Sequence, residues 1–325
     1  MNDVTNKIGA LYAYDIDKNG LAAQIDPSHL NERPKNTEGY RWVHLDLEHP
    51  SARDWIEAQT DQIVADSLTL DDTRPRCVPH NGGLLLNLRG VNLNPQSDPE
   101  DMVSIRMWIC GQMIISVRRR KLMAVVALRE ALDAGKGPKS VSAFVTYLAE
   151  GMTERMTPVI DGLVDQLDAL EEISIDKPQG LRAELADLRR TTIALRRYVG
   201  PQREALSRLG AEGGGVLNKD DQITLREIID RITRLVEEMD AMRERCGILN
   251  DQLADQRAEE MNRNTMVLSV VAAIFLPLGF LTGLLGVNVG GIPGAENKYA
   301  FTLLCLMMVI IGGAITLLFK RLKWI

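Results

Sequence analysis

Hydrophobic and polar positions follow one pattern over the first part of the chain, up to about Lys139. Short runs rich in Val, Ile, Leu and Trp alternate with Pro, Asn, Asp and Gly, which is the pattern of β-strands separated by turns. A helical stretch after Pro50, with Ser51 as its N-cap, interrupts the strands. Residues 1–139 are therefore predicted to form an α/β domain, with a tight hairpin at Gly111. The expected strands are 41–47, 82–93, 103–110 and 112–119.

The pattern changes after residue 139, where nearly all residues are helix formers. Breaks at 176–180 and 212–218 predict a helical hairpin over residues 140–218, followed by a helix that begins near Lys219. No glycine pair or proline interrupts this last helix before Pro277, so one rod of roughly 90 Å is expected at 1.5 Å per residue. A helix of this length needs partners, which predicts an oligomer held by a coiled coil or bundle.

Two apolar runs follow close to the C-terminus. Residues 265–295 and 299–319 contain no Asp, Glu, Lys or Arg. Each run supplies the ~20 apolar residues with which an α-helix crosses a bilayer. A buried hairpin of a soluble protein is the alternative, but a soluble helix this long normally has a polar face. The expected segments are a stalk helix at 219–264, transmembrane spans at 265–287 and 299–319, a loop at 288–298 and a basic tail at 320–325.

Charges flanking the two spans predict their orientation. By the positive-inside rule both termini are cytoplasmic and the loop faces the outside, as in a multi-pass protein of the bacterial inner membrane. The N-terminal stretch has no apolar signal segment. The basic flanking residues are Arg257 and Arg263 before the first span and Lys320, Arg321 and Lys323 after the second, whereas the loop holds only Glu296 and Lys298.

Composition excludes two classes of function. A formal net charge of -6 argues against a nucleic-acid partner, which normally needs a basic surface. No Walker loop, nucleophile elbow or paired-histidine motif is present, so neither an enzyme nor a bound cofactor is expected. Cys77 and His80 offer two metal ligands at short spacing, but a structural zinc site normally has four ligands and no second pair follows. The four cysteines are widely spaced and are expected to be free thiols.

A stripe of small and polar residues runs along the first span in steps of three and four. Two interpretations are open: close helix packing through small residues, or the wall of a pore in which small side chains leave room for a hydrated ion. Asn262 at one end and Asn288 beyond the other favour the pore, because an amide is expensive in lipid but can hold a water shell. The stripe consists of Asn262, Thr265, Ser269, Ala272, Leu276, Gly279, Gly283 and Gly286.

The same steps of three and four residues, continued toward the N-terminus, lead through Ala258 to Asp255 and Asp251. Around an axis of several copies, these two residues would form acidic rings that concentrate cations at the inner mouth. The alternative is an ordinary solvated helix face, and a straight helix drifts by ~20° per heptad from such a projection.

The C-terminal region resembles the CorA-type family of metal-ion transporters. The residues that carry the resemblance are "AAIFLPLGFLTGLLGVN", a short loop, a second span and the basic end "KRLKWI", with the family's Gly-x-Asn signature at Gly286, Val287 and Asn288. The segments 73–76 and 195–209 are similar to the family's cytoplasmic region. "GVNVGGIPG" is similar to the zinc-transporting ZntB branch, since Gly290 and Gly294 stand where magnesium-type members carry acidic residues.

This resemblance implies a funnel-shaped homopentamer in the lipid bilayer. Stalk helices and first spans would line a central pore, with the second spans outside them. Asn288 would form the outer selectivity ring and hold the hydrated ion, Asn262 would line the cytoplasmic end and Asp251 the mouth. The expected function is zinc uptake, with proton coupling as an option. The alternatives are a Mg²⁺, Co²⁺ or Ni²⁺ channel, zinc efflux, or a membrane-anchored oligomeric sensor or scaffold.

Overall fold

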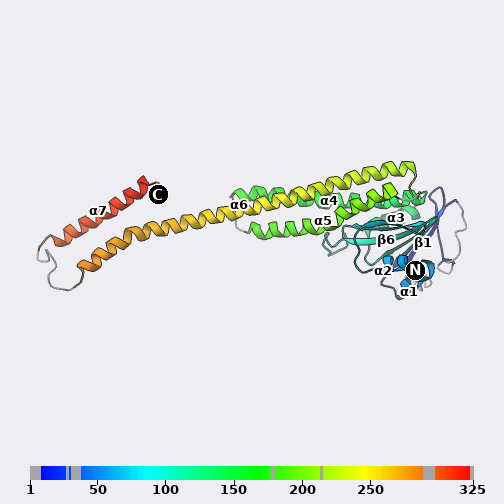
Figure 1. The fold of residues 1–325 in the computed structure, drawn as a ribbon, viewed down its shortest axis with the longest axis horizontal. Helices are drawn as coiled ribbons and strands as arrows, with labels where there is room; N and C mark the ends of the chain where they lie inside the picture. The colour runs from blue at the N-terminus through cyan, green and yellow to red at the C-terminus, as the bar shows by residue number, and fades with distance from the viewer. Residues whose placement is uncertain are drawn as a thin grey trace. The chain divides into compact units, whose positions relative to one another are not determined.

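The computed structural model describes residues 9–26, 29–30, 38–176, 180–212, 215–287 and 297–322, and its chain divides into two compact units, Met1–Leu249 and Asn250–Ile325 (Figure 1). In chain order the elements are β1 (Ala10–Ile16), β2 (Ala22–Gln24), β3 (Tyr40–Asp46), α1 (Pro50–Gln59), α2 (Gln62–Thr69), β4 (Arg76–His80), β5 (Gly83–Gly90), β6 (Val103–Cys110), β7 (Met113–Arg118), α3 (Met123–Asp133), α4 (Val141–Asp176), α5 (Leu181–Glu212), α6 (Lys219–Leu285) and α7 (Ala300–Arg321).

The strands form one seven-stranded sheet in the order β2-β1-β3-β7-β6-β5-β4. All neighbouring strands are antiparallel except β3 and β7, which run parallel with Arg41 opposite Met113. The hairpin predicted at Gly111 is confirmed, because Cys110 pairs with Met113 across it. At the β4–β5 turn, Asn81 and Gly82 both have positive φ, as a two-residue hairpin turn requires.

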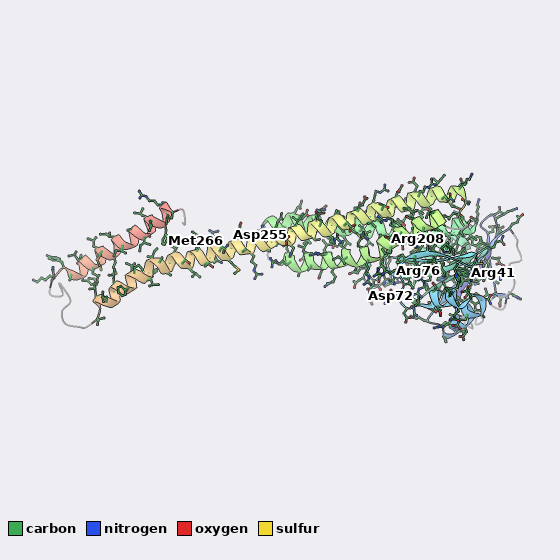
Figure 2. All side chains as sticks on the ribbon, in the orientation of Figure 1. Arg41, Asp72, Arg76, Arg208, Asp255 and Met266 are labelled. Carbon is green, nitrogen blue, oxygen red and sulfur yellow. The ribbon has the colours of Figure 1, made fainter. Side chains whose placement is uncertain are left out.

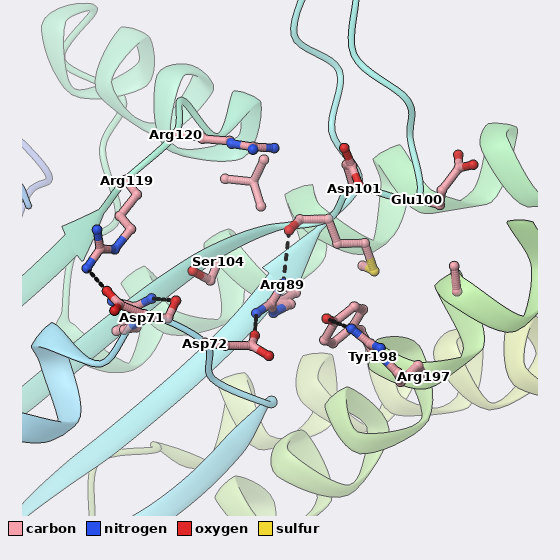
Figure 3. Close-up of a pocket in the computed structure, with 14 residues that line it drawn as sticks. Asp71, Asp72, Arg89, Glu100, Asp101, Ser104, Arg119, Arg120, Arg197 and Tyr198 are labelled. Atoms are coloured by element: carbon pink, nitrogen blue, oxygen red, sulfur yellow. Dashed lines mark hydrogen bonds and ion pairs between the residues drawn. The ribbon is translucent and has the colours of Figure 1, made fainter. Parts of the chain in front are cut away.

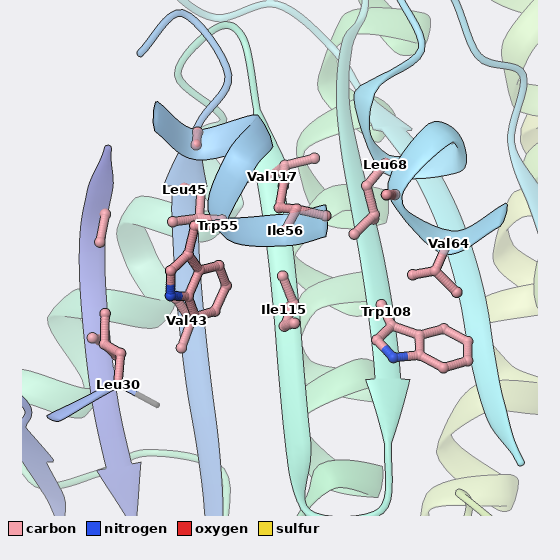
Figure 4. Close-up of a cluster of buried hydrophobic side chains, with 14 of the residues drawn as sticks. Leu30, Val43, Leu45, Trp55, Ile56, Val64, Leu68, Trp108, Ile115 and Val117 are labelled. Atoms are coloured by element: carbon pink, nitrogen blue, oxygen red, sulfur yellow. The ribbon is translucent and has the colours of Figure 1, made fainter. Parts of the chain in front are cut away.

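Helices α1 and α2 cover one face of this sheet (Figure 4). Side chains alternate along a strand, so Val43 and Leu45 of β3 and Ile115 and Val117 of β7 point to these helices, and all four are apolar. Trp55 and Ile56 of α1 and Val64 and Leu68 of α2 complete the cluster. The sheet contributes Val43, Leu45, Leu85, Trp108, Ile115 and Val117.

The opposite face packs against α3, α4 and α5. Trp42, which is fully buried, alternates with Val43 and therefore points to this second side. Its ring meets Phe144 of α4 edge-on, with the ring centroids 5.2 Å apart. Helix α5 packs on β4 and β5, and α4 packs on α3 and β5. The predicted α/β domain is thus a sheet with helices on both faces.

Most expected elements of this domain agree with the structure. The strand expected at 103–110 is β6, those at 41–47 and 112–119 differ from β3 and β7 by one residue at each end, and the one at 82–93 ends earlier, at Gly90. The assignment of Ser51 as N-cap was wrong. Helix α1 begins at Pro50, and His49 caps it by accepting the Ser51 N–H at 3.3 Å, because proline suits the first helical position, where no N–H is needed.

The helices that follow also begin and end close to the predicted breaks. Helix α6 starts at Lys219 and continues for 67 residues. Salt bridges join it to its neighbours: Arg245 lies 2.6 Å from Glu171 of α4, and Asp240 lies 3.2 Å from Arg196 of α5. Its buried residues recur in alternating steps of three and four, which is a heptad seam. The seam consists of Leu225, Ile228, Ile232, Leu235, Met239, Met242, Cys246, Leu249 and Leu253, and Val236 beside it is buried as well.

One histidine lies in the domain core. His44 is fully buried, and its Nδ1 lies 2.8 Å from the Ser116 hydroxyl, which accepts a hydrogen bond from the Trp42 indole N–H. Within the part of the chain that the structure describes, no protein atom bonds its Nε2. Burial lowers the pKa of His44 to about 3, and the nearby Arg118 charge adds to this effect.

This lowered pKa predicts acid destabilisation of the domain. The histidine of the unfolded chain titrates near pH 6.5. As pH falls from 6.5 toward 3, His44 therefore binds a proton in the unfolded chain but stays neutral in the folded chain. Stability is therefore present above pH 6.5, and about 2 kcal/mol of it is lost between pH 7 and 5. Urea unfolding of the full-length protein, followed by tryptophan fluorescence, measures the loss. His44→Gln removes the titration, so an equal loss in this variant would contradict the assignment.

Candidate functional site

The stripe expected on the first span is exposed along α6. Asn262, Thr265, Ser269, Ala272, Gly279, Gly283 and Gly286 are all exposed, and Leu276 retains 73% of its accessible surface. Asp251 and Asp255, on the same count, are exposed as well. Figure 2 shows the side chains of this helix, with Asp255 and Met266 labelled. The stripe is therefore a bare surface of the single chain.

Another face of α6 is partly covered by α7. Leu278 reaches α7 at Gly312, where a Cβ placed on that glycine would lie 3.9 Å from Leu278 Cδ1. Partly buried residues on α7 recur at the spacing of one helix face, including Leu304, Met308 and Ile311. Over residues 265–285 of α6 the partly buried residues are Met266, Val270, Ile274, Pro277, Leu278 and Leu281.

The stripe and the α7-facing residues lie on nearly opposite sides of α6. At 3.6 residues per turn, the mean directions of the two sets differ by about 150°. Toward the N-terminus the relation continues, since Asp251 and Asp255 each lie two residues beyond the buried Leu249 and Leu253, a rotation of about 200°. One side of the helix thus packs, and the other carries the small and polar residues.

Two hydroxyl groups in the apolar part of α6 donate hydrogen bonds to carbonyl oxygens of the same helix. Ser269 belongs to the stripe and Thr282 does not. Ser269 donates to the Thr265 carbonyl at 2.8 Å, and Thr282 donates to the Gly279 carbonyl at 3.0 Å. Each hydroxyl oxygen then keeps lone pairs for an outside donor or cation. Pro277 has no N–H, so the Ala273 carbonyl four residues earlier lacks its usual helical donor. The surface therefore offers oxygen acceptors.

The glycines of the stripe differ in what surrounds them. A Cβ on Gly279 or Gly283 would meet nothing within 4 Å among the described residues, so packing within one chain does not require glycine there. A Cβ on Gly286 would lie 2.8 Å from the Thr282 carbonyl oxygen, which accepts the Gly286 N–H at 2.9 Å. Gly286 is thus needed for the local backbone. Val287 is half exposed, and Asn288, Gly290 and Gly294 lie outside the described residues.

Cys77 and His80 are not brought together. They lie three residues apart on β4, so their side chains point to opposite faces of the strand. Cys77 is buried, whereas His80 Nε2 lies 2.8 Å from the carboxylate of Asp61. In the described ranges no group of three or more His, Cys, Asp or Glu residues is placed to hold a metal ion.

The face of α6 that α7 covers was not predicted from the sequence. A signal was present, because Val270, Ile274 and Leu281 recur in helical steps on the side away from the stripe. Both α6 and α7 are long and apolar enough to cross a membrane, and none of the most apolar stretch of either is buried. The structure thus presents two apolar helices, and the side of α6 away from α7 carries the stripe of small and polar residues.

The chain is similar to known transporters along nearly its whole length. Residues 37–321 match the family described as CorA-like Mg²⁺ transporter protein. The chain is 39% identical to the divalent cation transporter CmaX of Pseudomonas aeruginosa over 325 residues, covering 98% of this chain and 97% of that protein. It is 36% identical to the zinc transport protein ZntB of Pectobacterium carotovorum over 319 residues, covering 98% and 96%.

Solved structures agree with this relationship. The full-length CmaX structure superposes with a TM-score of 0.84 at 38% identity, covering 98% of both chains. The CorA magnesium transporter of Methanocaldococcus jannaschii superposes with a TM-score of 0.79, covering 97% of this chain and 99% of that one. At 17% identity, the second match shows a shared fold alone.

Proposed function

Because this chain belongs to the CorA-like Mg²⁺ transporter family, we propose that it conducts divalent cations, with zinc as the main ion, through a pore lined by α6. The observation that carries this proposal is the bare stripe of small and polar residues on the side of α6 away from α7. If several copies surround an axis, this side faces the axis and α7 lies outside. Small side chains then leave room for an ion with its water shell.

The proposed assembly is a homopentamer in a bacterial inner membrane, with both termini in the cytoplasm. Large apolar side chains on α6 support burial in lipid or against other copies, since Phe275 and Phe280 are 66% and 67% exposed in the single chain. If α6 stood in water, this apolar surface would stay exposed to solvent, at a free-energy cost of roughly 25 cal/mol per Å². The basic residues that flank the two spans support the orientation.

Zinc is proposed from the ZntB relatives and from the joining loop. The stripe offers hydroxyl, amide and carbonyl oxygens, whereas zinc sites that bind the bare ion use nitrogen and sulfur ligands. Selection would therefore act on the hydrated ion, at an Asn288 ring with nearby backbone carbonyls. Such binding is weak enough for the ion to leave, as conduction requires. Glu296 and Lys298 cancel in charge, so the outer mouth has no acidic field to favour Mg²⁺.

Uptake is the proposed direction, with protons as the proposed coupling ion. Neither 265–287 nor 299–319 contains a carboxylate, so a proton relay through buried acids in the spans has no residues to use. Coupling would run through water in the pore and through groups outside the membrane, such as Asp251 and Asp255.

Reconstituted vesicles test these proposals. The purified protein is reconstituted into the membrane of vesicles that enclose a zinc-sensitive or a magnesium-sensitive dye. Ion flux is recorded with and without a pH gradient. Zinc influx that exceeds Mg²⁺ influx and increases with an inward proton gradient is expected. Faster Mg²⁺ flux would overturn the zinc assignment, and an unaltered rate would overturn proton coupling. Absence of flux for every divalent ion would favour the sensor or scaffold.

The two aspartates are expected to increase flux by concentrating cations. The double variant Asp251→Asn with Asp255→Asn should lower zinc flux several-fold at low ionic strength and by less at high salt, because salt screens exposed charges. The matched control is Glu259→Gln with Glu260→Gln, which removes the same charge from exposed positions off the stripe. Equal effects of both double variants would indicate a general surface charge rather than rings at the mouth.

A further inference from the structure

A charged pocket of about 410 Å³ lies within the first unit (Figure 3). Its walls come from the segment after α2, the strand β5, the segment before β6, β6 itself, the residues after β7, and α5. This volume is within the range of small-molecule sites, about 300–1,000 Å³. The pocket is far along the sequence from the stripe on α6, and the transport proposal does not use it.

The lining contains five arginines and four carboxylates, which leaves one net positive charge. Two of the carboxylates are already occupied. Asp72 pairs with Arg89 at 2.5 Å, and Asp71 pairs with Arg119. Within the described chain Arg106, Arg120 and Arg197 form no ion pair, although the charges of Asp71 and Asp72 favour the charged form of Arg106, and that of Asp72 favours the charged form of Arg197.

Arg106 is a buried cation without a carboxylate partner. It is 1% exposed, and its three hydrogen bonds go to the Thr73 hydroxyl and to the backbone carbonyls of Leu68 and Asp71, at 3.0 to 3.2 Å. A guanidinium has five N–H donors, so two are left. Burial lowers the pKa of Arg106 to about 10, and the next cause is repulsion from Arg119 and Arg89. Arg106 stays charged at neutral pH, and a counter-anion would offset the cost of its burial.

Arg120 follows the paired Arg119 and is exposed. Among the described residues it makes no hydrogen bond or ion pair. Figure 3 shows Arg119 and Arg120 on one side of the pocket and Glu100 and Asp101 on the other. Glu100 accepts a hydrogen bond from the Thr191 hydroxyl at 2.9 Å, which holds that wall against α5. Arg120 and the carboxylates of Glu100 and Asp101 therefore line the same pocket.

We propose that this pocket binds a phosphate ester of a polyhydroxyl compound, such as a sugar phosphate. The planar guanidinium fork matches phosphate oxygens in pairs, which places the phosphate at Arg106 and Arg120. The carboxylates of Glu100 and Asp101 accept hydrogen bonds from the hydroxyl groups. The Tyr198 ring is not offered to a nucleotide base, because the guanidinium groups of Arg89 and Arg197 already lie 4.1 and 4.7 Å from its centre.

Calorimetric titration of the purified full-length protein in detergent tests this site, with ribose 5-phosphate, inorganic phosphate and ribose as probes. Ribose 5-phosphate is expected to bind most tightly. Arg120→Ala should weaken it about tenfold, which is 1.4 kcal/mol. Arg74→Ala removes the same charge from an exposed position outside the pocket and should change the affinity less than about twofold.

Asp101→Asn tests whether this carboxylate binds the hydroxyl groups of the ligand. It should strengthen binding of inorganic phosphate, because a repelling charge is lost, and should narrow the advantage of ribose 5-phosphate over phosphate. No binding of ribose 5-phosphate at millimolar concentration, or equal weakening by Arg120→Ala and Arg74→Ala, would overturn the proposal. The titration does not depend on flux, so its failure leaves cation transport untouched.

Discussion

Gly283→Leu is expected to reduce zinc flux by at least about tenfold while leaving the folded chain intact. A Cβ added at this position would meet no atom of the described chain within 4 Å, so a larger side chain starts from open space in the single protomer. In the proposed pore the same side chain, repeated in every copy, would fill the space through which the hydrated ion passes. Apolar groups would then close the pore at this level, and an apolar constriction also expels water.

The matched control is Gly313→Leu on α7. Gly313 is likewise exposed and has no atom within 4 Å of an added Cβ in the described chain, but it belongs to the helix that the proposed assembly puts outside the pore. Flux in reconstituted vesicles and oligomer size by light scattering are measured for both variants. If Gly283→Leu conducts as well as Gly313→Leu, the stripe does not line the ion path. If Gly283→Leu only dissociates the oligomer, the packing interpretation of the stripe is preferred.

Asn288→Ala is the second change with a large expected effect, the loss of measurable flux. The resemblance to the CorA-type family places this residue in the Gly-x-Asn signature, directly after Gly286 and Val287. An amide offers both a donor and an acceptor to the waters around an ion, and alanine offers neither. With the ring of amides removed, the hydrated ion would have no site at the outer end of the pore.

The pentamer should survive this substitution, because a single amide contributes little to the interface of two long helices. Asn264→Ala serves as the control, since Asn264 is exposed on α6 two residues away from Asn262 and off the stripe. Zinc flux and light scattering are measured side by side. Normal flux in Asn288→Ala with an intact oligomer would refute the selectivity ring.

Local pattern was enough to predict most of the fold. The residues of β6 are mostly apolar and Gly111 follows the last of them, so the strand and its hairpin follow from nearby residues alone. Helix α6 was predicted because nothing between Lys219 and Pro277 breaks it. Strands β1, β2 and β4 were not predicted. Strand β2 is only three residues long, and Pro79 within β4 argues against a strand unless it lies at a sheet edge, as it does.

The candidate site was predictable only where it is periodic. The stripe from Asn262 to Gly286 repeats along one helix, so its alignment follows from helix geometry. The pocket at Arg106 has no such period, because its residues come from separate strands and from α5. No spacing rule connects Asp72 with Arg89, or Arg120 with Tyr198, before the sheet order is known. The structure alone brings these charges together.

The parallel pair β3–β7 has a consequence for the connectivity of the sheet. Strands β4 to β7 form a meander in which each strand pairs with its neighbour in sequence, and β1 pairs with β2 and β3 in the same local way. Only at β3–β7 do segments as distant as Arg41 and Met113 meet. The entropy lost in closing long loops grows with the logarithm of loop length, so within the sheet this loss is concentrated in that one central pairing.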